Sequence, residues 1–231
     1  MSKYKILKEQ AYECNMELPR RNLVIYTFGN VSAYDESLGV FAIKPSGVPY
    51  EELKPELMVI VDLDYKVVEG KLRYSSDTKT HAVLYKNFKG IGGVVHTHSP
   101  YGVAWAQAKK PVPIFGTTHA DHLTHDIPCT PVMSDEQIKG DYEEETGKLI
   151  CRTFRNLSYT EIEMTLVACH GSFTWGKTPE KAVYNAAVAE ELAKMALLTI
   201  TVDPKTTRLK KALINKHYQR KHGTNAYYGQ K

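Results

Sequence analysis

The apolar and polar residues of this chain form short runs that fit β-strands, separated by longer stretches with the periodicity of amphipathic helices. Apolar residues recur at helical spacing over residues 4–16, which predicts a helix that ends near Pro19. Thr178 and Pro179 are residue types that begin helices, and they precede a helical stretch that reaches residue 198. The same pattern predicts strands at 23–27, 39–44, 58–62, 66–69, 91–98 and 166–169, a turn at 28–32, and helices at 81–88, 101–109 and 143–154.

Strands that alternate with helices indicate the α/β fold class. The 231 residues fit a single domain, 1–231, with a central, largely antiparallel β-sheet covered by helices. No apolar stretch approaches the roughly 18 residues of a membrane span, and the first residues lack the apolar segment of a signal peptide. Four cysteines without framework spacing suit a reducing compartment, so we expect a cytoplasmic protein with no membrane partner.

The net charge of +4 conceals a basic C-terminal segment. Residues 205–231 carry eight Lys or Arg and no Asp or Glu, which leaves 22 basic and 26 acidic residues in the rest of the chain. Within this segment Leu209, Ile214 and Tyr218 interleave with the charges at helical spacing, which predicts a helix with one packed face. We therefore expect an anionic small molecule or an acidic neighbouring subunit as the partner, and no nucleic acid.

His96 and His98 follow the apolar run 91–95 and stand two residues apart. Residues i and i+2 of a strand point to the same face, roughly 6 to 7 Å apart, so two imidazoles placed in this way can bind one metal ion. A second apolar run, 166–169, ends at His170, and two strands that deliver histidines to one rim would build a three-histidine site. Three protein ligands with one open position is the arrangement of catalytic metal sites. Since no two cysteines form a C-x-x-C pair, a structural zinc ribbon is not expected.

Three short segments have the residue types that bind anions. One is a tight glycine turn, one is a strand end with a cation and a hydroxyl, and one offers two serines where a helix begins. Beside a metal motif, these segments indicate a phosphorylated substrate. The segments are Gly29-Asn30, Lys44-Pro45-Ser46-Gly47 and Ser75-Ser76.

These motifs occur in the order seen in class II aldolases and their epimerase relatives, and the chain resembles that family from Leu18 to Gln230. Its last residues, 216–230, are similar to those of the L-ribulose-5-phosphate 4-epimerase branch of the family. The resemblance rests on this C-terminal segment and on six motifs in order. The motifs are Gly29-Asn30-Val31-Ser32, Lys44-Pro45-Ser46-Gly47, Ser75-Ser76-Asp77, His96-Thr97-His98, Gly116-Thr117-Thr118-His119-Ala120-Asp121 and His170-Gly171.

The resemblance implies one divalent metal ion per subunit, of the zinc type, with manganese and cobalt as alternatives. It implies His96, His98 and His170 as the metal ligands. It also implies Asp77 as an acidic partner at the metal and a sugar phosphate as the substrate. The residues implied in binding the substrate and its phosphate are Gly29, Asn30, Ser46, Gly47, Ser75 and Ser76.

The family pattern further implies a homotetramer with its active sites at the subunit interfaces. The segment 205–231 is expected to contribute to the active site of a neighbouring subunit. Asp121 and Tyr228 are expected to enter from that adjacent chain as the two acid/base groups, on opposite sides of the substrate. Lys44 and His217 also match motif positions, with no role assigned to them.

The implied function is interconversion of L-ribulose 5-phosphate and D-xylulose 5-phosphate in pentose catabolism of the arabinose type. Because the C4 hydrogen is not acidic, we expect retro-aldol cleavage of the C3–C4 bond, rotation of the aldehyde and re-addition, with a metal ion to stabilise negative charge. The alternative is a class II aldolase that cleaves a deoxyketose 1-phosphate. In such aldolases the position of Asp77 is commonly Glu, so Asp77 favours the epimerase. A non-catalytic interaction module would have lost its metal ligands, and here all of them are present.

Overall fold

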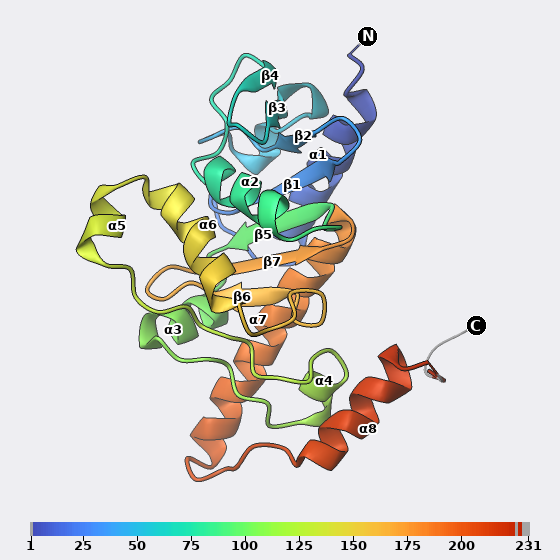
Figure 1. Cartoon of the computed structure of the whole chain (residues 1–231), viewed down its shortest axis with the longest axis vertical. Coiled ribbons are helices and arrows are strands. Elements are labelled where there is room, and N and C mark those ends of the chain that lie inside the picture. The colour runs from blue at the N-terminus through green and yellow to red at the C-terminus, as the bar shows by residue number, and fades with distance from the viewer. Residues whose placement is uncertain (1, 225, 228–231) are drawn as a thin grey trace.

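The structure is a computed structural model that describes residues 2–224 and 226–227. Its strands are β1 (Asn30–Asp35), β2 (Val40–Ile43), β3 (Val59–Asp62), β4 (Val67–Glu69), β5 (Gly93–Thr97), β6 (Met164–Leu166) and β7 (Ser172–Gly176). They form one seven-stranded sheet in the order β4-β3-β2-β1-β5-β7-β6, in which every pairing is antiparallel. Helices cover both faces (Figure 1), so the predicted α/β fold with a central, largely antiparallel sheet is confirmed.

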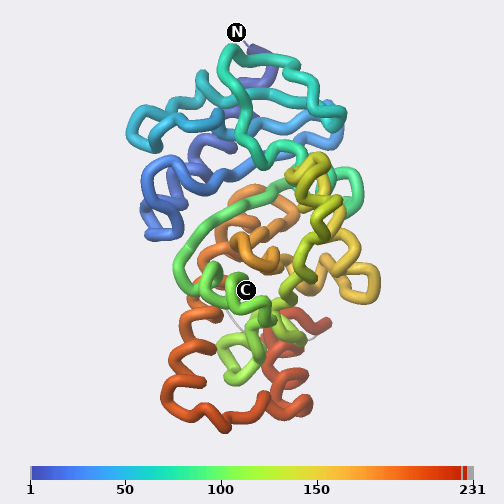
Figure 2. The backbone as a smooth tube through the Cα atoms, turned by 90° about the vertical axis from the view of Figure 1, so that its left-hand side faces the viewer, coloured from blue at the N-terminus to red at the C-terminus, as the bar shows by residue number. Residues whose placement is uncertain are grey.

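The helices are α1 (Lys5–Arg20), α2 (Thr78–Asn87), α3 (Pro100–Ala108), α4 (Thr117–Ala120), α5 (Asp135–Lys139), α6 (Tyr142–Thr153), α7 (Pro179–Val202) and α8 (Lys211–His222), with short 3-10 helices η1 (Tyr50–Glu52) and η2 (Pro55–Leu57). Val31 of β1 belongs to the apolar cluster beneath α1 and the first half of α7, whereas Val94 of β5 belongs to the cluster beneath α2 and α6. The long α7 continues past the sheet to the lower end of the molecule, where α4 and α8 pack together (Figures 1 and 2).

The register of the adjacent strands β1, β5 and β7 sets a row of side chains on the α2 face of the sheet. Asn30 of β1 lies opposite His96 of β5, and His96 in turn lies opposite Phe173 of β7. Residues directly opposite one another on antiparallel strands share a face of the sheet. Ser32, two residues after Asn30, is on the same face and contacts His81 of α2. This end of the sheet therefore carries the polar residues of the candidate site.

The strand predicted at 23–27 and the turn predicted at 28–32 are wrong. Tyr26 and Gly29 have positive φ angles of 51° and 76°, which an extended strand does not allow. Ile25 and Tyr26 are 63% and 82% exposed, so the apolar composition of this run does not reflect burial. The segment is an irregular loop, and strand pairing begins only at Asn30.

The strand predicted to end at His170 is also wrong. β6 ends at Leu166, and the N–H of Val167 donates to the carbonyl of Gly171 in a tight turn that leads into β7. Cys169 in this turn has a φ of 65°, in the left-handed region. His170 is therefore presented by a turn between two strands. Neither β7 nor α5 was predicted from the sequence pattern.

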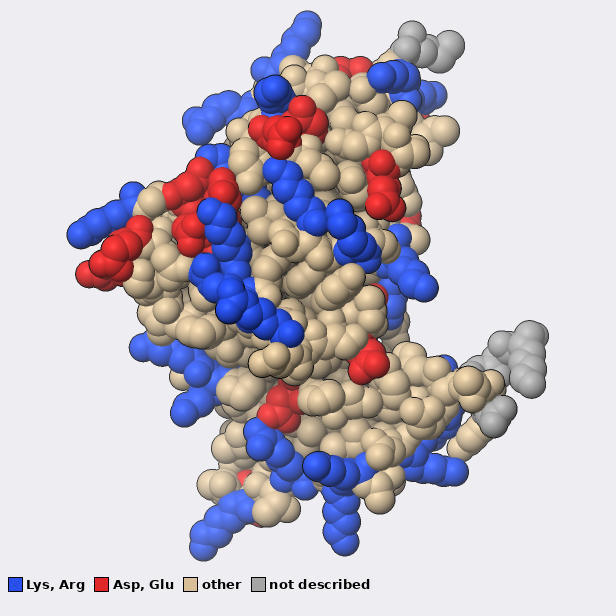
Figure 3. Space-filling view, in the orientation of Figure 1, with Lys and Arg blue, Asp and Glu red and all other residues tan. Residues whose placement is uncertain are grey.

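Other predictions are confirmed. β3 and β4 form where strands are predicted at 58–62 and 66–69, and they pair antiparallel. α7 begins after Thr178, whose side chain accepts a hydrogen bond from the N–H of Lys181. The basic segment contains α8, whose Ile214 is buried against Ala120 of α4, as expected for a helix with one packed face. In the space-filling view, Lys and Arg side chains lie over this lower end of the molecule as well as over the rest of the visible face (Figure 3). Among the described residues, no helix has the length and apolarity needed to span a membrane.

Replacing Asn15 with Ala tests the link between α1 and β1. Asn15 is fully buried; its amide donates to the carbonyls of Ala11 and Val31, and its side-chain oxygen accepts from the N–H of Val31. Because Asn15→Ala leaves both backbone groups of Val31 without partners, we expect the free energy of unfolding to fall by about 2–4 kcal/mol in urea titrations. Gln10→Ala, which removes an exposed hydrogen bond to Glu180, is the control. Equal effects of the two substitutions would contradict this account.

Candidate active site

Three histidines from two parts of the chain meet at one end of the sheet. The candidate ligand atoms of His96, His98 and His170 all lie within 4.8 Å of one another. His96 Nε2 is 2.9 Å from His98 Nε2, close to the roughly 3.3 Å expected between two nitrogens bound to one tetrahedral zinc ion. Gly171 permits this approach, because a Cβ there would lie 2.6 Å from the carbonyl oxygen of Thr97. Within residues 2–224 and 226–227, no other group of three His, Cys, Asp or Glu residues converges in this way.

The surroundings of the histidines favour their neutral, metal-binding form. His96 Nδ1 donates a hydrogen bond of 2.9 Å to the carbonyl of Ser172, which leaves the lone pair of the ring on Nε2. Burial lowers the pKa of His96 and of His98, and burial together with His96 lowers the pKa of His170 to about 4. Neutral imidazoles need not lose a proton before they bind a metal ion.

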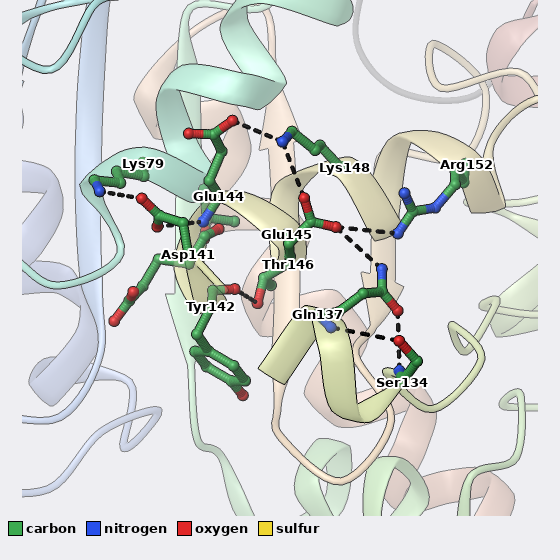
Figure 4. A network of polar contacts seen from close by, with 12 residues as sticks. Lys79, Ser134, Gln137, Asp141, Tyr142, Glu144, Glu145, Thr146, Lys148 and Arg152 are labelled. Atoms are coloured by element: carbon green, nitrogen blue, oxygen red, sulfur yellow. Dashed lines mark hydrogen bonds and ion pairs between the residues drawn. The ribbon is translucent and has the colours of Figure 1, made fainter. Parts of the chain in front are cut away.

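A second contact reaches the cluster from α6. The hydroxyl of Tyr142, the first residue of that helix, lies 3.4 Å from Nδ1 of the third histidine. A network of charges fixes this end of α6: Lys79 pairs with the N-cap residue Asp141, and Lys148 pairs with Glu144 at 2.8 Å (Figure 4). The ring of Tyr142 points away from these charges (Figure 4). The network therefore sets the position from which Tyr142 approaches the histidines.

Asp77 lies at the start of α2 as its N-cap residue. Asn30 Nδ2 donates to Asp77 Oδ2 at 2.7 Å and to Ser75 Oγ at 3.0 Å, so the sheet holds the carboxylate directly. Burial alone would raise the pKa of Asp77, but its interactions with His96 and His81 and the Asn30 hydrogen bond lower the pKa below its ordinary value. Asp77 is therefore an anion next to the histidine cluster.

One cavity of about 410 Å³ joins the histidines to the three predicted anion-binding segments. In its wall Ser46, Gly47 and Ser76 are exposed, whereas Asn30 and Ser75 are buried. All ten residues predicted to bind the metal ion or the substrate lie in this wall. The lining residues are Thr27, Phe28, Gly29, Asn30, Lys44, Pro45, Ser46, Gly47, Ser75, Ser76, Asp77, His96, His98 and His170.

Two backbone features shape the anion-binding end of the cavity. Gly29 has a φ of 76°, and a Cβ there would lie 2.6 Å from Val24 Cγ1 and 2.9 Å from the carbonyl oxygen of His96, so only glycine fits. The buried Lys44 donates to the carbonyl of Val48 at 2.6 Å, and burial lowers the pKa of its ammonium group to about 8. Lys44 therefore fixes the loop that carries Ser46 and Gly47 as well as facing the cavity.

Asp121 lies outside this cavity, immediately after α4. α8 holds its carboxylate: Arg220 contacts both oxygens at 3.0 and 2.8 Å, and His217 Nδ1 lies 3.0 Å from one of them. Burial would raise the pKa of Asp121, but hydrogen bonds from these residues and the charge of Lys221 lower it. In a single chain, therefore, Asp121 and the histidines are not brought together. Tyr228 lies outside the described residues.

The sequence pattern does not predict three residues that contact the histidine cluster, Asp77 or Asp121. His81 lies one helical turn after Asp77, on the same helix. The helix predicted at 81–88 starts too late to place the two residues on one helical face. Tyr142 approaches the third histidine from a helix with no metal motif. Arg220 was seen only as part of a basic segment, although its partner Asp121 was predicted as catalytic.

A model of the Class II Aldolase and Adducin N-terminal domain family matches residues 9–197. The chain belongs to this family. Members of the class II aldolase family use a divalent metal ion, typically zinc. Three imidazoles with a carboxylate at their side are donors that suit zinc, so the residues present fit such an ion.

Three solved structures of the same fold are similar to the chain. An L-fuculose 1-phosphate aldolase has a TM-score of 0.79 at 21% identity, over 95% of this chain and 97% of that one. The L-fuculose 1-phosphate aldolase from Glaciozyma antarctica has a TM-score of 0.75 at 17% identity, over 94% and 81%. The L-fuculose-1-phosphate aldolase from Thermus thermophilus has a TM-score of 0.65 at 22% identity, over 88% and 98%. At these identities the similarity establishes the fold.

The metal-free protein should lose stability as the pH falls. Burial lowers the pKa of His81 to about 3 and that of His119 to about 4, whereas both return to about 6.5 in the unfolded chain. Below about pH 6.5 the unfolded chain therefore binds more protons, and the free energy of unfolding should decrease between about pH 6.5 and 4.5. Urea unfolding of chelator-treated protein at each pH measures this slope, and exposed His125→Ala should leave it unchanged. His170, whose pKa is lowered to about 4, adds to the same slope, and a flat profile would contradict the burial of neutral histidines in the folded chain.

Proposed function

We propose that this protein is a metal-dependent epimerase that interconverts L-ribulose 5-phosphate and D-xylulose 5-phosphate in pentose catabolism of the arabinose type. The observation that carries the proposal is the single cavity in which the histidine cluster and the anion-binding segments face one another. A pentose phosphate has a reactive polyol at one end and a phosphate at the other. The cavity likewise has the histidine cluster in one part of its wall and the anion-binding segments in another.

The phosphate is proposed to bind at the N-terminus of α2. The helix dipole favours anions there, and the hydroxyls of Ser75 and Ser76 stand beside this end of the helix. Gly29 and the loop of Ser46 and Gly47 would add backbone N–H groups, which reach an anion more closely than a side chain can. The phosphate would then fix the distance from C5 of the substrate to the histidines.

His96, His98 and His170, with Asp77 beside them, are proposed to hold one zinc-type ion, with manganese or cobalt as alternatives. Such an ion would supply Lewis-acid stabilisation for negative charge on the substrate oxygens next to the breaking C–C bond. The Ser172 carbonyl and the Tyr142 hydroxyl would keep two of the rings oriented for this role.

Asp121 and Tyr228 are proposed as the acid/base pair, supplied by the neighbouring subunit. Loss of the C4 hydroxyl proton to one of them breaks the C3–C4 bond and leaves glycolaldehyde phosphate beside the C1–C3 fragment. Rotation of the aldehyde presents its other face, the bond re-forms, and the second group returns a proton to the C4 oxygen. His217 and Arg220, which contact Asp121, would keep its carboxylate charged and oriented.

The position of Asp77 supports the epimerase over an aldolase. An aldolase must add a proton to C3 of its cleaved fragment in order to release a ketone, whereas an epimerase must keep that carbon unprotonated until the bond re-forms. Asp77 is short, and Asn30 holds one of its oxygens at 2.7 Å. A carboxylate fixed in this way stabilises cations at the site and is poorly placed to deliver a proton to carbon.

A class II aldolase acting on a deoxyketose 1-phosphate is the second candidate. The fuculose-phosphate aldolases among the structural relatives favour it, since their chains superimpose on nearly the whole of this one. The two candidates share the metal-binding and phosphate-binding residues. They differ in whether cleaved fragments leave the site.

Self-association is proposed because the proposed acid/base group and the histidines are apart in one chain. The second half of α7 leaves apolar side chains in solvent, with Met195 43%, Leu198 51% and Val202 87% exposed. An exposed apolar patch of this kind marks a protein contact surface. A homotetramer in which the segment 205–231 and Asp121 reach the cavity of a neighbour would cover such a surface.

Substrate turnover in D₂O separates the two candidates. With zinc-loaded protein and L-ribulose 5-phosphate, we expect D-xylulose 5-phosphate that carries no deuterium at C3, because the fragment is never protonated, and no free glycolaldehyde phosphate. Product analysis by NMR measures both. His96→Ala should lower the epimerase activity at least about 100-fold. Release of free aldehyde and ketone would support the aldolase, and no turnover of this substrate would contradict the epimerase.

Mixing two inactive variants tests the shared site. We expect His96→Ala and Asp121→Asn each to lower kcat by about 100-fold or more. When the two chains are coexpressed in equal amounts, a site with an intact histidine from one subunit and an intact Asp121 from its neighbour should recover about a quarter of the wild-type activity. His96→Ala mixed with His98→Ala is the matched control, because both changes fall on the same side of the interface. A mixture as inactive as its parents would contradict the shared site.

A further inference from the structure

Two residues of β1 hold one face of α2 in a ladder of hydrogen bonds. Asn30 contacts Asp77 at 2.7 Å, and Ser32 Oγ lies 2.7 Å from both His81 Nδ1 and Tyr85 OH. Asn30 and Ser32 are separated by about 6.7 Å along a strand, and Asp77 and His81 by about 6 Å along a helix, so the two spacings match. The start of α2 is therefore fixed to the sheet at two points.

His81 is an unusual residue for this position. It is fully buried, it stacks edge-on against Phe173 at 6.2 Å, and its Nε2 has no hydrogen-bond partner. Asn30 Oδ1 is the other buried side-chain atom without a partner in the described part of the chain. A buried nitrogen without a partner costs about 1–3 kcal/mol, so an imidazole is a poor choice for packing alone. Both unpartnered atoms belong to residues that flank Asp77, which points to a role at the site.

We infer that His81 is a positioning residue for the metal site: it holds Asp77 at the histidine cluster from one helical turn away. The inference rests on the proposed metal site and adds to it a residue that does not line the cavity. Its Nδ1 anchors the first turn of α2, and with it the N-cap residue Asp77, to Ser32 of the sheet.

Zinc affinity measures this role without any substrate. We would titrate each protein with zinc in competition with a chromophoric chelator at pH 7, and follow folding by circular dichroism and urea unfolding. Residues that orient metal ligands typically change metal affinity by about 10–100-fold, and we expect His81→Leu to weaken zinc binding by that factor. His81→Asn, whose side-chain amide can occupy the place of Nδ1 and bond to Ser32, should recover part of the loss. Ser32→Ala, which frees Nδ1, should weaken zinc binding in the same direction.

Tyr85→Phe is the matched control. Tyr85 is also buried, lies on the same face of α2 one turn further on, and contacts the same serine hydroxyl. Its removal should lower the free energy of unfolding and leave zinc affinity within about twofold, since it is two turns away from Asp77. If Tyr85→Phe weakens zinc binding as much as the His81 variants do, the effect is general loosening of α2 and the inference is overturned.

Further outcomes separate the inference from the proposed function. Wild-type protein that binds zinc in a His96-dependent manner, together with folded His81 and Ser32 variants of unchanged affinity, would overturn the inference alone. If His81→Leu does not fold, His81→Asn and Ser32→Ala decide by the same criterion. Wild-type protein without stoichiometric zinc, or zinc retained in His96→Ala, would remove the metal site itself and the inference with it. An absence of epimerase activity would leave the affinity measurements, and so the inference, intact.

Discussion

The candidate site depends on the antiparallel pairing of β1 with β5. In this register Asn30 lies opposite His96 on one face, while Val31 lies opposite Val95 on the other. Val31 and Val95 are 0% and 1% exposed beneath α1. A slip of β1 by one residue would turn Val31 toward α2 and Asn30 into the apolar cluster beneath α1, away from His96. Burial of apolar side chains on the α1 face therefore fixes the polar chemistry on the opposite face.

Two further segments lie against this pair of strands. The tight turn before β7 presents His170, and Gly171 lets it approach the end of β5. The start of α2 presents Asp77, which Asn30 holds from the sheet. Each of these polar groups is partly buried beside a hydrogen-bond partner, so its desolvation is largely compensated. Two buried atoms of the described residues have no partner, His81 Nε2 and Asn30 Oδ1; Asn30 bonds to Asp77 through its Nδ2, and His81 lies one helical turn after Asp77.

The parts of the fold that could be predicted from the sequence are those set by local pattern. The run before His96 is apolar at every buried position, which predicts the strand β5. Thr178-Pro179 has the local signature of a helix start, which predicts the helix α7. The run 166–169 has the composition of a strand, yet Cys169 in it takes a left-handed conformation. That conformation follows from two backbone hydrogen bonds, from Cys169 to Ala106 and from Val167 to Gly171, which the local sequence does not encode. The loop 23–29 likewise follows from the close approach of Gly29 to β5, which no local pattern encodes.

The same limit applies to the candidate site. The histidines and the anion-binding segments carry recognisable residue types at recognisable spacings, and they line one cavity. Arg220 and His217 contact Asp121 across nearly a hundred residues of sequence, and such a pairing depends on how α8 packs against α4. The proposed roles of Asp121 and Tyr228 depend on a second subunit. Local sequence pattern does not specify contacts between subunits.

X-ray absorption at the zinc edge of stoichiometrically loaded protein tests the central claim most directly, because it reports the atoms that surround the ion. The account predicts three imidazole nitrogens at about 2.0–2.1 Å and additional light oxygen ligands, with no sulfur. It also predicts that His170→Ala reduces the imidazole count to two. A sulfur shell at about 2.3 Å, or an unchanged spectrum in His170→Ala, would contradict a metal centre built from β5 and the turn before β7.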